Sequence, residues 1–285
     1  MKTSLHSIHD FKETAYDWLV KEESINNLLL GLIHRIIDEN RYPDVVCLTV
    51  KSEESLKAAA IMTPPHNLVV GIRSDEEDLD KIGESLFNFL IEQNIEFPGI
   101  IGVKQSTVQL AEIWTNKTGD TFKIGMDQGI YECREVVDRK FSEGYVAVAG
   151  EKYINLLSDW MIAFCKESKI PMVTKEEAFT RMRDSVQSKS MYMWFVEGKP
   201  VSMAMRGRKS KNGETVSLVY TPVEFRKNGY GSSVVAEVSK QILAERKLCN
   251  LYTDLTNQTS NKIYQEIGYN FLCESIMLEK NKLSS

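Results

Sequence analysis

Long apolar runs, histidine and cysteine are all scarce in this 285-residue sequence. No uninterrupted apolar run approaches the roughly 18 residues that a membrane-spanning helix requires. The four histidines show no spacing typical of a metal site, so we expect neither a membrane span nor a bound metal. Five scattered cysteines favour buried free thiols in a reducing cytoplasm over a disulfide framework. Polar residues near the start, such as His6, Asp10 and Lys12, argue against a signal peptide.

An excess of basic charge is also lacking. The 35 lysines and arginines are outnumbered by 40 aspartates and glutamates, which gives a net charge of −5. Such a chain has no overall positive field to hold nucleic acid, so we expect no nucleic-acid partner. The densest basic stretch, Arg206 to Lys211, is expected to be a solvated hairpin. A hydrophobic content of 42% is ordinary for a globular protein, and the length suits two domains.

Hydrophobic periodicity predicts the same order of elements twice. The first half has helical spacing over 10–40, 74–93 and 107–114, and strand patterns over 45–50, 56–62, 68–72, 99–103 and 122–137. The second half has helical spacing over 151–167, 175–186, 231–246 and 260–266, and strand patterns over 191–196, 200–206, 215–221, 251–255 and 269–278. We therefore expect tandem domains over residues 1–137 and 138–285. A weak echo between Thr63-Pro64 and Thr221-Pro222 fits a duplication.

The most informative segment begins with the strand-like run Val216–Thr221. Pro222 ends the run, and a short charged loop leads through Gly229-Tyr230-Gly231 into an amphipathic segment. A helix N-terminus carries unpaired N–H groups and a partial positive charge, which attract phosphate. Glycine allows close approach of a ligand to the backbone. The pattern therefore indicates a pyrophosphate-binding loop, although an ordinary turn before a helix fits the spacing equally well.

Two motifs resemble those of the GNAT N-acetyltransferases. Arg226-x-x-Gly229-x-Gly231 is similar to the acetyl-CoA loop of that family, [RQ]-x-x-G-x-[GA]. A later segment resembles the family pattern N-x-x-[SA]-x-x-[LI]-Y-x-x-x-G-[FY]. It matches at Asn257, Ser260, Ile263, Tyr264, Gly268 and Tyr269. The resemblance covers about residues 141–280. It implies an α+β fold with a central mixed, mostly antiparallel twisted sheet flanked by helices, like the acyl-CoA N-acyltransferases, in two tandem domains.

The resemblance also implies roles for individual residues. Acetyl-CoA would be the cosubstrate, with its pantetheine along the backbone of Val219, Tyr220 and Thr221. Asn257 and Asn261 would supply amide hydrogen bonds to the cofactor. The pyrophosphate would contact Arg226, Lys227, Asn228, Gly229, Tyr230, Gly231 and Ser232. Tyr264 would protonate the departing thiolate, since a phenol with a pKa near 10 can donate to it at hydrogen-bond distance.

Several of these assignments have structural alternatives. Tyr264 lies in an apolar pattern with Ile263 and Ile267, which a packed core tyrosine would also show. Asn261 fits a helix cap, and Asp254 fits loop packing as well as substrate contact. Glu224 is expected to be structural. No general base is evident: Glu214 is expected to lie too far away, and a water-mediated route is the default.

The expected activity is transfer of an acetyl group to a primary amine, and the acceptor stays open between small molecules and peptides. The negative net charge mildly favours a cationic acceptor. A CoA-binding sensor without catalysis is the alternative, because the base is missing. The first half has no counterpart of the Arg226–Gly231 loop after Thr63-Pro64. It is therefore expected to be a degenerate copy that covers the acceptor pocket or mediates a homodimer.

Overall fold

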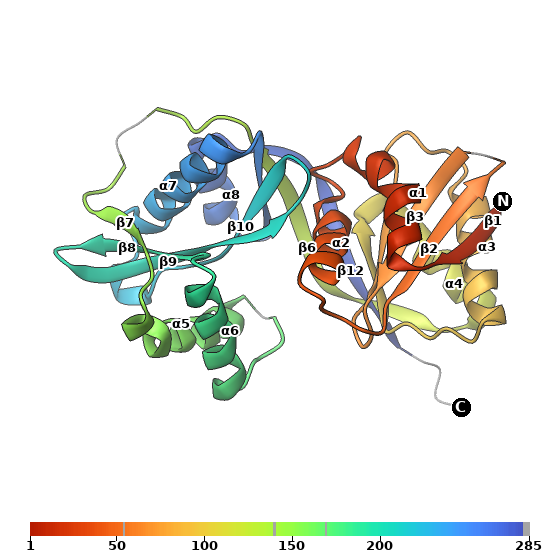
Figure 1. The fold of residues 1–285 in the computed structure, drawn as a ribbon, viewed down its shortest axis with the longest axis horizontal. Helices are drawn as coiled ribbons and strands as arrows, with labels where there is room; N and C mark the ends of the chain where they lie inside the picture. Colours follow the sequence, from red (N-terminus) through yellow and green to blue (C-terminus); the bar gives the residue numbers. More distant parts are fainter. Residues whose placement is uncertain (54, 139–140, 169, 282–285) are drawn as a thin grey trace.

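The chain folds into two repeats with an identical order of helices and strands (Figure 1). The computed structural model describes residues 1–53, 55–138, 141–168 and 170–281. The first repeat consists of β1 (Lys2–His6), α1 (Ile8–Val20), α2 (Asn27–Asp38), β2 (Val46–Ser52), β3 (Ser55–Met62), β4 (Leu68–Ile72), α3 (Leu79–Glu92), β5 (Gly99–Val103), α4 (Lys104–Thr118) and β6 (Thr121–Cys133). The second consists of β7 (Tyr145–Val148), α5 (Ile154–Glu167), α6 (Lys175–Gln187), β8 (Met191–Val196), β9 (Lys199–Lys209), β10 (Gly213–Tyr220), α7 (Tyr230–Glu245), β11 (Leu248–Asp254), α8 (Gln258–Ile267) and β12 (Asn270–Asn281). Short 3₁₀ turns, Glu151–Tyr153 and Val223–Phe225, precede α5 and α7.

All twelve strands belong to one sheet in the order β1-β2-β3-β4-β5-β12-β6-β11-β10-β9-β8-β7. The pairs β4–β5 and β10–β11 are parallel, and the other pairs are antiparallel. The predicted α+β fold with a mixed, mostly antiparallel sheet is therefore confirmed.

The final strand of each repeat pairs with the other repeat. β6 follows α4 but pairs with β11, whereas β12 follows α8 but pairs with β5. The two exchanged strands are long and antiparallel to each other, from Asn270↔Glu132 to Asn281↔Thr121. In Figure 1 they run through the middle of the molecule. The sheet is thus continuous across the predicted boundary near residue 137, and that boundary stays a prediction.

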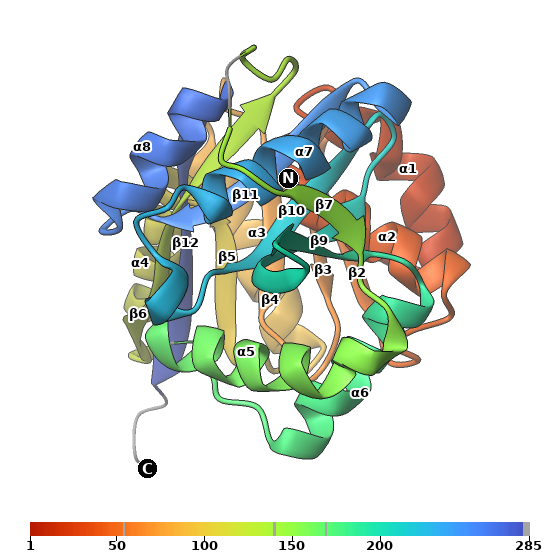
Figure 2. The same ribbon diagram turned by 90° about the vertical axis from the view of Figure 1, so that its left-hand side faces the viewer.

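Helices cover both faces of the sheet. In the second repeat, α7 lies on one face and α5 and α6 lie on the other (Figure 2). Because β6 and β12 are antiparallel and the strand order is mirrored about them, a twofold relation perpendicular to the sheet connects the repeats. This relation places α2 on the same face as α5 and α6. Contacts between α2 and β9 agree with that placement.

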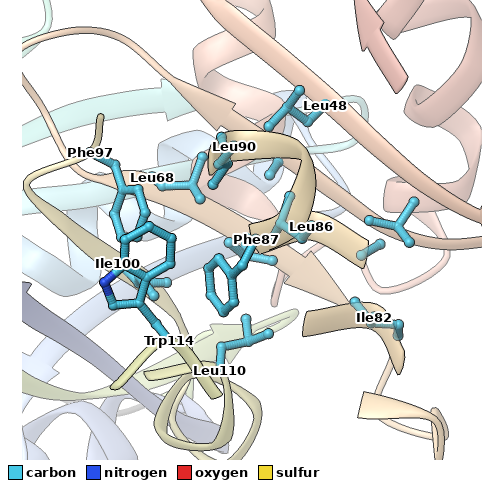
Figure 3. Close-up of a cluster of buried hydrophobic side chains, with 14 of the residues drawn as sticks. Leu48, Leu68, Ile82, Leu86, Phe87, Leu90, Phe97, Ile100, Leu110 and Trp114 are labelled. Atoms are coloured by element: carbon cyan, nitrogen blue, oxygen red, sulfur yellow. The ribbon is translucent and has the colours of Figure 1, made fainter. Parts of the chain in front are cut away.

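Each repeat has its own hydrophobic core on each face of the sheet. Beneath α3 and α4, Phe97 and Trp114 meet edge to face with centroids 4.7 Å apart, beside Phe87 (Figure 3). The core beneath α7 is built from valine and leucine side chains together with Tyr131 and Tyr269. All five cysteines are free, and four of them are buried. Of the described helices, none is both long and apolar enough to cross a membrane.

Polar contacts also join the repeats. The buried Glu23, in the turn between α1 and α2, accepts hydrogen bonds from Ser210 Oγ (2.6 Å), Asn212 N (2.6 Å) and Asn212 Nδ2 (2.8 Å). These donors lie in the hairpin between β9 and β10. Within the first repeat, Ser24 of the same turn donates to Glu132 of β6, the strand that pairs with β11 of the second repeat. The first repeat therefore holds the β9–β10 hairpin of the second.

The structure corrects several predicted elements. The expected helix over 10–40 is two helices, α1 and α2, separated by a turn over 21–26. Strands β1 and β7 were missed, because both are short and lie at the edges of the sheet. The helix expected from Ser74 starts at Leu79 instead.

The Thr63-Pro64 echo is not structurally equivalent to Thr221-Pro222. Thr63-Pro64 follows β3, the third strand of the first repeat, whereas Thr221-Pro222 follows β10, the fourth strand of the second. The counterpart of β10 is β4, so the loop equivalent to Arg226–Gly231 runs from Arg73 to Asp78.

Candidate functional site

A gap opens in the sheet between β10 and β11. The two strands pair only through Gly213↔Leu248, Glu214↔Cys249 and Thr215↔Asn250, although both continue well beyond that point. From Val216 onward the edge of β10 is therefore free of a strand partner on this side. The resemblance implied that pantetheine lies along Val219, Tyr220 and Thr221, and an extended ligand can hydrogen bond to the exposed backbone there.

A β-bulge shapes the free edge of β10. The register with β9 passes from Ser217↔Met205 to Tyr220↔Met203 and leaves Leu218 and Val219 unpaired. Leu218 has a φ of 48°, a left-handed conformation that costs a non-glycine residue about 1–3 kcal/mol. Strain of this kind is typical of sites where backbone groups are aimed at a ligand.

The predicted phosphate loop lies at the N-terminus of α7. Gly229 is the N-cap residue with φ 75°, and no side chain caps this helix end. The N–H of Ser233 closes the first turn on the carbonyl of Gly229 at 3.0 Å. The preceding N–H groups point out of the helix end, where they and the helix dipole attract an anion. Of the expected contacts, Arg226, Lys227, Asn228 and Gly229 are exposed, whereas Ser232 is buried.

The glycines of the loop are required by close contacts. A Cβ at Gly229 would lie 2.6 Å from Ser142 Oγ, and one at Gly231 would lie 3.1 Å from Thr221 Oγ1. Ser142 also donates from Oγ to the carbonyl of Asn228 at 2.6 Å. Ser142, which stabilises the loop from a distant segment, belongs to no motif and was not predicted.

The side chain of Arg226 faces the end of β10. Its Nε donates to the carbonyl of Thr221 at 2.9 Å, and its Nη2 pairs with Glu167 Oε2 of α5 at 2.5 Å. Glu167 also accepts a hydrogen bond from the Tyr220 hydroxyl at 3.2 Å. Arg226 is half-exposed and therefore free to exchange this partner for a phosphate.

The second motif forms the other side of the gap. Asn257 caps α8, and its side-chain oxygen Oδ1 already accepts a hydrogen bond from Ser260 N at 3.0 Å. Asn261 donates to the carbonyls of Asp254 (3.3 Å) and Leu255 (3.2 Å). Its Oδ1 is buried and has no hydrogen-bond partner among the described residues. This orphaned acceptor, at the end of β11, suits an amide N–H of a ligand in the gap.

Tyr264 lies on α8 and packs edge to face on Tyr269, with centroids 6.1 Å apart. Burial raises the pKa of the Tyr264 phenol to about 12. Within the described part of the chain, its hydroxyl donates to no partner that would occupy the proton. Tyr264 is thus partly packed, as the core alternative requires, and also has a proton to donate.

Glu214, considered as a general base, and Asp254, considered as a substrate contact, are both bound to other groups of the protein. Glu214 is buried and forms an ion pair with Arg206 at 2.6 Å. Arg206 also forms an ion pair with Glu245 of α7 at 2.8 Å. Asp254 accepts from the backbone and side chain of Thr256 at 2.8 and 2.7 Å. Glu214 is therefore structural, in line with the expectation that it lies away from the reaction.

The basic stretch 206–211 is not the solvated hairpin that we expected. Arg206 is only 12% exposed in its side chain, because its two carboxylate partners neutralise it inside the protein. Arg208 packs on the ring of Tyr252, 5.2 Å from its centroid. Only Lys209 and Lys211 of this stretch are exposed. Spacing alone could not reveal this, since the partners come from α7, β10 and β11.

The equivalent gap of the first repeat is filled. β4 and β5 also pair only at their beginnings, Leu68↔Ile100 and Val69↔Ile101. Asn26 and Leu29 pack against Gly71 in the space beyond, where a cavity of about 20 Å³ remains. That volume holds about one water molecule and no extended ligand.

The loop of the first repeat is also unsuited to an anion. Residues 75–78 are Asp-Glu-Glu-Asp, where the second repeat has its glycine-containing loop. Glu76 Oε1 accepts from the N–H of Asp78 at 3.2 Å and so occupies the start of α3 with a carboxylate of the protein itself. Carboxylates at this point repel phosphate, so among the described residues the start of α7, and not that of α3, suits an anion.

Comparisons with known proteins agree with this geometry. Residues 193–277 match the family model described as FR47-like protein. No curated protein matches the sequence. A GCN5-related N-acetyltransferase from Sphaerobacter thermophilus is similar in structure, with a TM-score of 0.61, 10% identity and coverage of 98% of this chain and 94% of that one.

Two further structures extend the similarity over the whole chain. A GNAT-family acetyltransferase from Colwellia psychrerythraea has a TM-score of 0.58 at 12% identity, covering 99% of this chain and 100% of that one. A tandem GNAT protein of the clavulanic acid biosynthesis pathway has a TM-score of 0.56 at 9% identity, covering 100% and 99%. The chain thus has the fold of tandem GNAT proteins, and residues 193–277 of its second repeat match the FR47-like family model.

Proposed function

We propose that the protein transfers an acetyl group from acetyl-CoA to a primary amine, and that the second repeat alone carries out this reaction. The observation that carries the proposal is the gap between β10 and β11, which lies beside an uncapped helix N-terminus. Pantetheine is an extended chain with amide groups, and a diphosphate follows it. The free edge of β10 and the start of α7 offer these two groups complementary sites in the same order.

The residues present fit this cosubstrate. The unpaired backbone at Leu218 and Val219 can bond the pantetheine amides, and an N–H there can polarise the thioester carbonyl. The buried Oδ1 of Asn261 lacks a hydrogen-bond partner among the described residues, and an amide N–H from the opposite side would supply one. The Arg226 guanidinium stands near the end of β10, within reach of the diphosphate.

The reaction then proceeds by direct attack. The amine nitrogen bonds to the thioester carbon, the C–S bond breaks, and Tyr264 gives its proton to the departing thiolate. A phenol whose pKa is raised to about 12 stays protonated at neutral pH, as an acid must. The proton lost by the amine passes to water, because Glu214 is committed to Arg206.

A sensor that binds acetyl-CoA without using it is the competing function, favoured by the lack of a free carboxylate at the gap. Release of free thiol from acetyl-CoA, measured over a panel of primary amines, separates the two. An enzyme raises thiol release in proportion to the amine, whereas a sensor leaves it at background with every amine.

Arg226→Glu tests the cosubstrate site by titration calorimetry with acetyl-CoA. Loss of a charged hydrogen bond and the added repulsion should raise the Kd of acetyl-CoA by at least about tenfold. Arg183→Glu is the matched control, since Arg183 is an exposed arginine of α6 paired with Asp184. If Arg226→Glu and Arg183→Glu bind acetyl-CoA equally well, the assignment of the diphosphate to this loop is wrong.

A further inference from the structure

A polar surface lies beneath the gap, on the face of the sheet opposite α7. Val216 of β10 and Leu251 of β11 pack into the core under α7. Side chains alternate between the faces of a strand, so Thr215, Asn250 and Tyr252 point the other way. On that side α2 approaches, and Asn27 Nδ2 donates to the Tyr252 hydroxyl at 3.1 Å. Thr215 and Asn250 are the last paired residues at the closed end of the gap.

A bulge in β9 brings a guanidinium to the same place. The register shifts between Glu214↔Lys209 and Val216↔Arg206, so Arg206 and Arg208 face opposite sides of the sheet. Arg208 Nη2 donates to Asn27 Oδ1 at 3.3 Å, and its guanidinium lies over the ring of Tyr252. Gly207 makes this bulge possible, because a Cβ there would lie 2.5 Å from Thr215 Oγ1.

Four polar atoms of this surface lack hydrogen-bond partners among the described residues. They are Arg208 Nε, Thr215 Oγ1, Asn250 Nδ2 and Asn250 Oδ1, and all are buried. Asn250 is 0% exposed, and its amide is unused on both atoms. Buried amide and guanidinium groups are rarely left unpaired, so such a cluster indicates a bound partner.

No carboxylate of the described residues forms an ion pair with Arg208 or raises its pKa. Arg206, two residues earlier, is neutralised by Glu214 and Glu245. Desolvation lowers the pKa of Arg208, and the other groups that influence it are Tyr252 and Arg35, neither of which is a carboxylate. A guanidinium remains charged in a protein, so this surface presents a positive charge in a partly enclosed position. Arg208 is partly exposed, which leaves part of its guanidinium group accessible to a ligand.

We propose that the acceptor is an amino acid, or a small molecule with the same amine and carboxylate, whose carboxylate binds Arg208 and Asn250 Nδ2 beneath the gap. The inference rests on the proposed acetyl transfer. Asn250 Oδ1 and Thr215 Oγ1 then accept from the amine and hold it at the closed end of the gap, toward which the thioester points from the bulge at Leu218. The negative charge of the whole chain favours a cation, but the local charge at this surface is positive and selects a carboxylate.

Matched pairs of acceptors test the proposal on the full-length protein. Glycine is compared with methylamine, L-alanine with ethylamine and L-phenylalanine with 2-phenylethylamine, each as acceptor with acetyl-CoA. The wild type should prefer at least one acid over its decarboxylated partner by about 10- to 100-fold in kcat/KM, as expected for a charged hydrogen-bonded pair. Equal use of both members of every pair that reacts would overturn the proposal.

Variants then identify the residue that binds the carboxylate of the acceptor. Arg208→Gln should abolish the preference by raising KM for the acid, with the Kd of acetyl-CoA unchanged. Thr215→Val, which keeps the shape of the side chain, should raise KM for both members of a pair. Lys209→Gln removes an exposed charge next to Arg208. It should change neither the preference for the acid nor the KM of either acceptor. A preference that survives in a folded Arg208→Gln protein would contradict the assignment.

A binding measurement separates failure of this inference from failure of the proposed function. Glycine, L-alanine and L-phenylalanine are titrated calorimetrically into wild type and Arg208→Gln, each saturated with CoA. Binding that Arg208→Gln weakens by about tenfold or more supports the carboxylate site even if no acetyl transfer occurs. If acetyl transfer occurs with amines while these acids neither bind nor react, the proposed function stands and the carboxylate site is refuted.

Discussion

A chain truncated to residues 138–285 is expected not to fold, although it contains every residue of the proposed acetyl-CoA site. The truncation removes β6, which lies between β11 and β12 and not at an edge of the sheet. Ile130, Tyr131 and Cys133 of this strand are 1%, 3% and 0% exposed. Loss of each large side chain alone costs about 2–5 kcal/mol, and a domain has only about 5–15 kcal/mol of stability in total. Circular dichroism during urea unfolding should show no cooperative transition.

A chain of residues 121–285 is the matched control for the truncation. It keeps β6 and therefore restores the pairs of β6 with β11 and β12. It still lacks β5, the second partner of β12, and the contacts of Glu23 with the β9–β10 hairpin. We expect a cooperative transition at a lower urea concentration than for the full chain. A well-folded and active 138–285 chain would show that the strand exchange is not needed for stability.

Tyr264→Phe is expected to lower kcat by about 10²- to 10⁴-fold, the usual contribution of a general acid, with acetyl-CoA affinity nearly unchanged. The substitution removes only the hydroxyl and preserves the ring that packs on Tyr269. Tyr145→Phe is the control, because Tyr145 is 56% exposed and lies on edge strand β7. Stopped assays of thiol release give kcat, and titration calorimetry gives the affinity.

The raised pKa of Tyr264 also predicts the pH range over which it can act as an acid. Burial raises its pKa to about 12, so the proton is retained where an ordinary phenol would lose it. In the wild type, kcat should not fall between about pH 9 and pH 11 through ionisation of a tyrosine. A kcat unaltered by Tyr264→Phe would refute the acid assignment and favour the core alternative.

Several elements of both repeats were predictable, because their signals are local. The bounds of β4, β5 and β8 match the predicted strands, and those of α6 differ by one residue. Alternating apolar residues and Gly-containing turns determine such elements without help from distant parts of the chain. The edge strands β1 and β7 were missed because pairing, not composition, makes them strands.

The partners of the exchanged strands were not predictable. Nothing in the residues of β6 shows that it pairs with β11, since an alternating pattern specifies a face and not a neighbour. The start of α3 was misplaced for a related reason. Ser74 suits an N-cap position, but its hydroxyl and N–H bond Glu22 of the α1–α2 turn, and the helix begins only after Asp78.

The parts of the candidate site that belong to a sequence motif were predictable. The parts that come together only through folding were not. Gly229 and Gly231 lie at the start of α7 and Tyr264 lies on α8, on the elements that their motifs indicated. The bulge at Leu218 has no signature, because leucine seldom adopts a positive φ. The bulge at Gly207 could have been predicted, because a glycine within a strand often marks a bulge. This bulge turns the side chain of Arg208 to the face of the sheet opposite Arg206.

We propose that the second repeat binds acetyl-CoA and that the first repeat does not. Isothermal titration of the full-length protein with acetyl-CoA tests this directly, because the two repeats are otherwise alike in fold. The filled gap at Gly71 and the carboxylate at the start of α3 predict one molecule bound per chain. Two molecules bound per chain, or no binding at all, would contradict the proposal that only the second repeat binds acetyl-CoA.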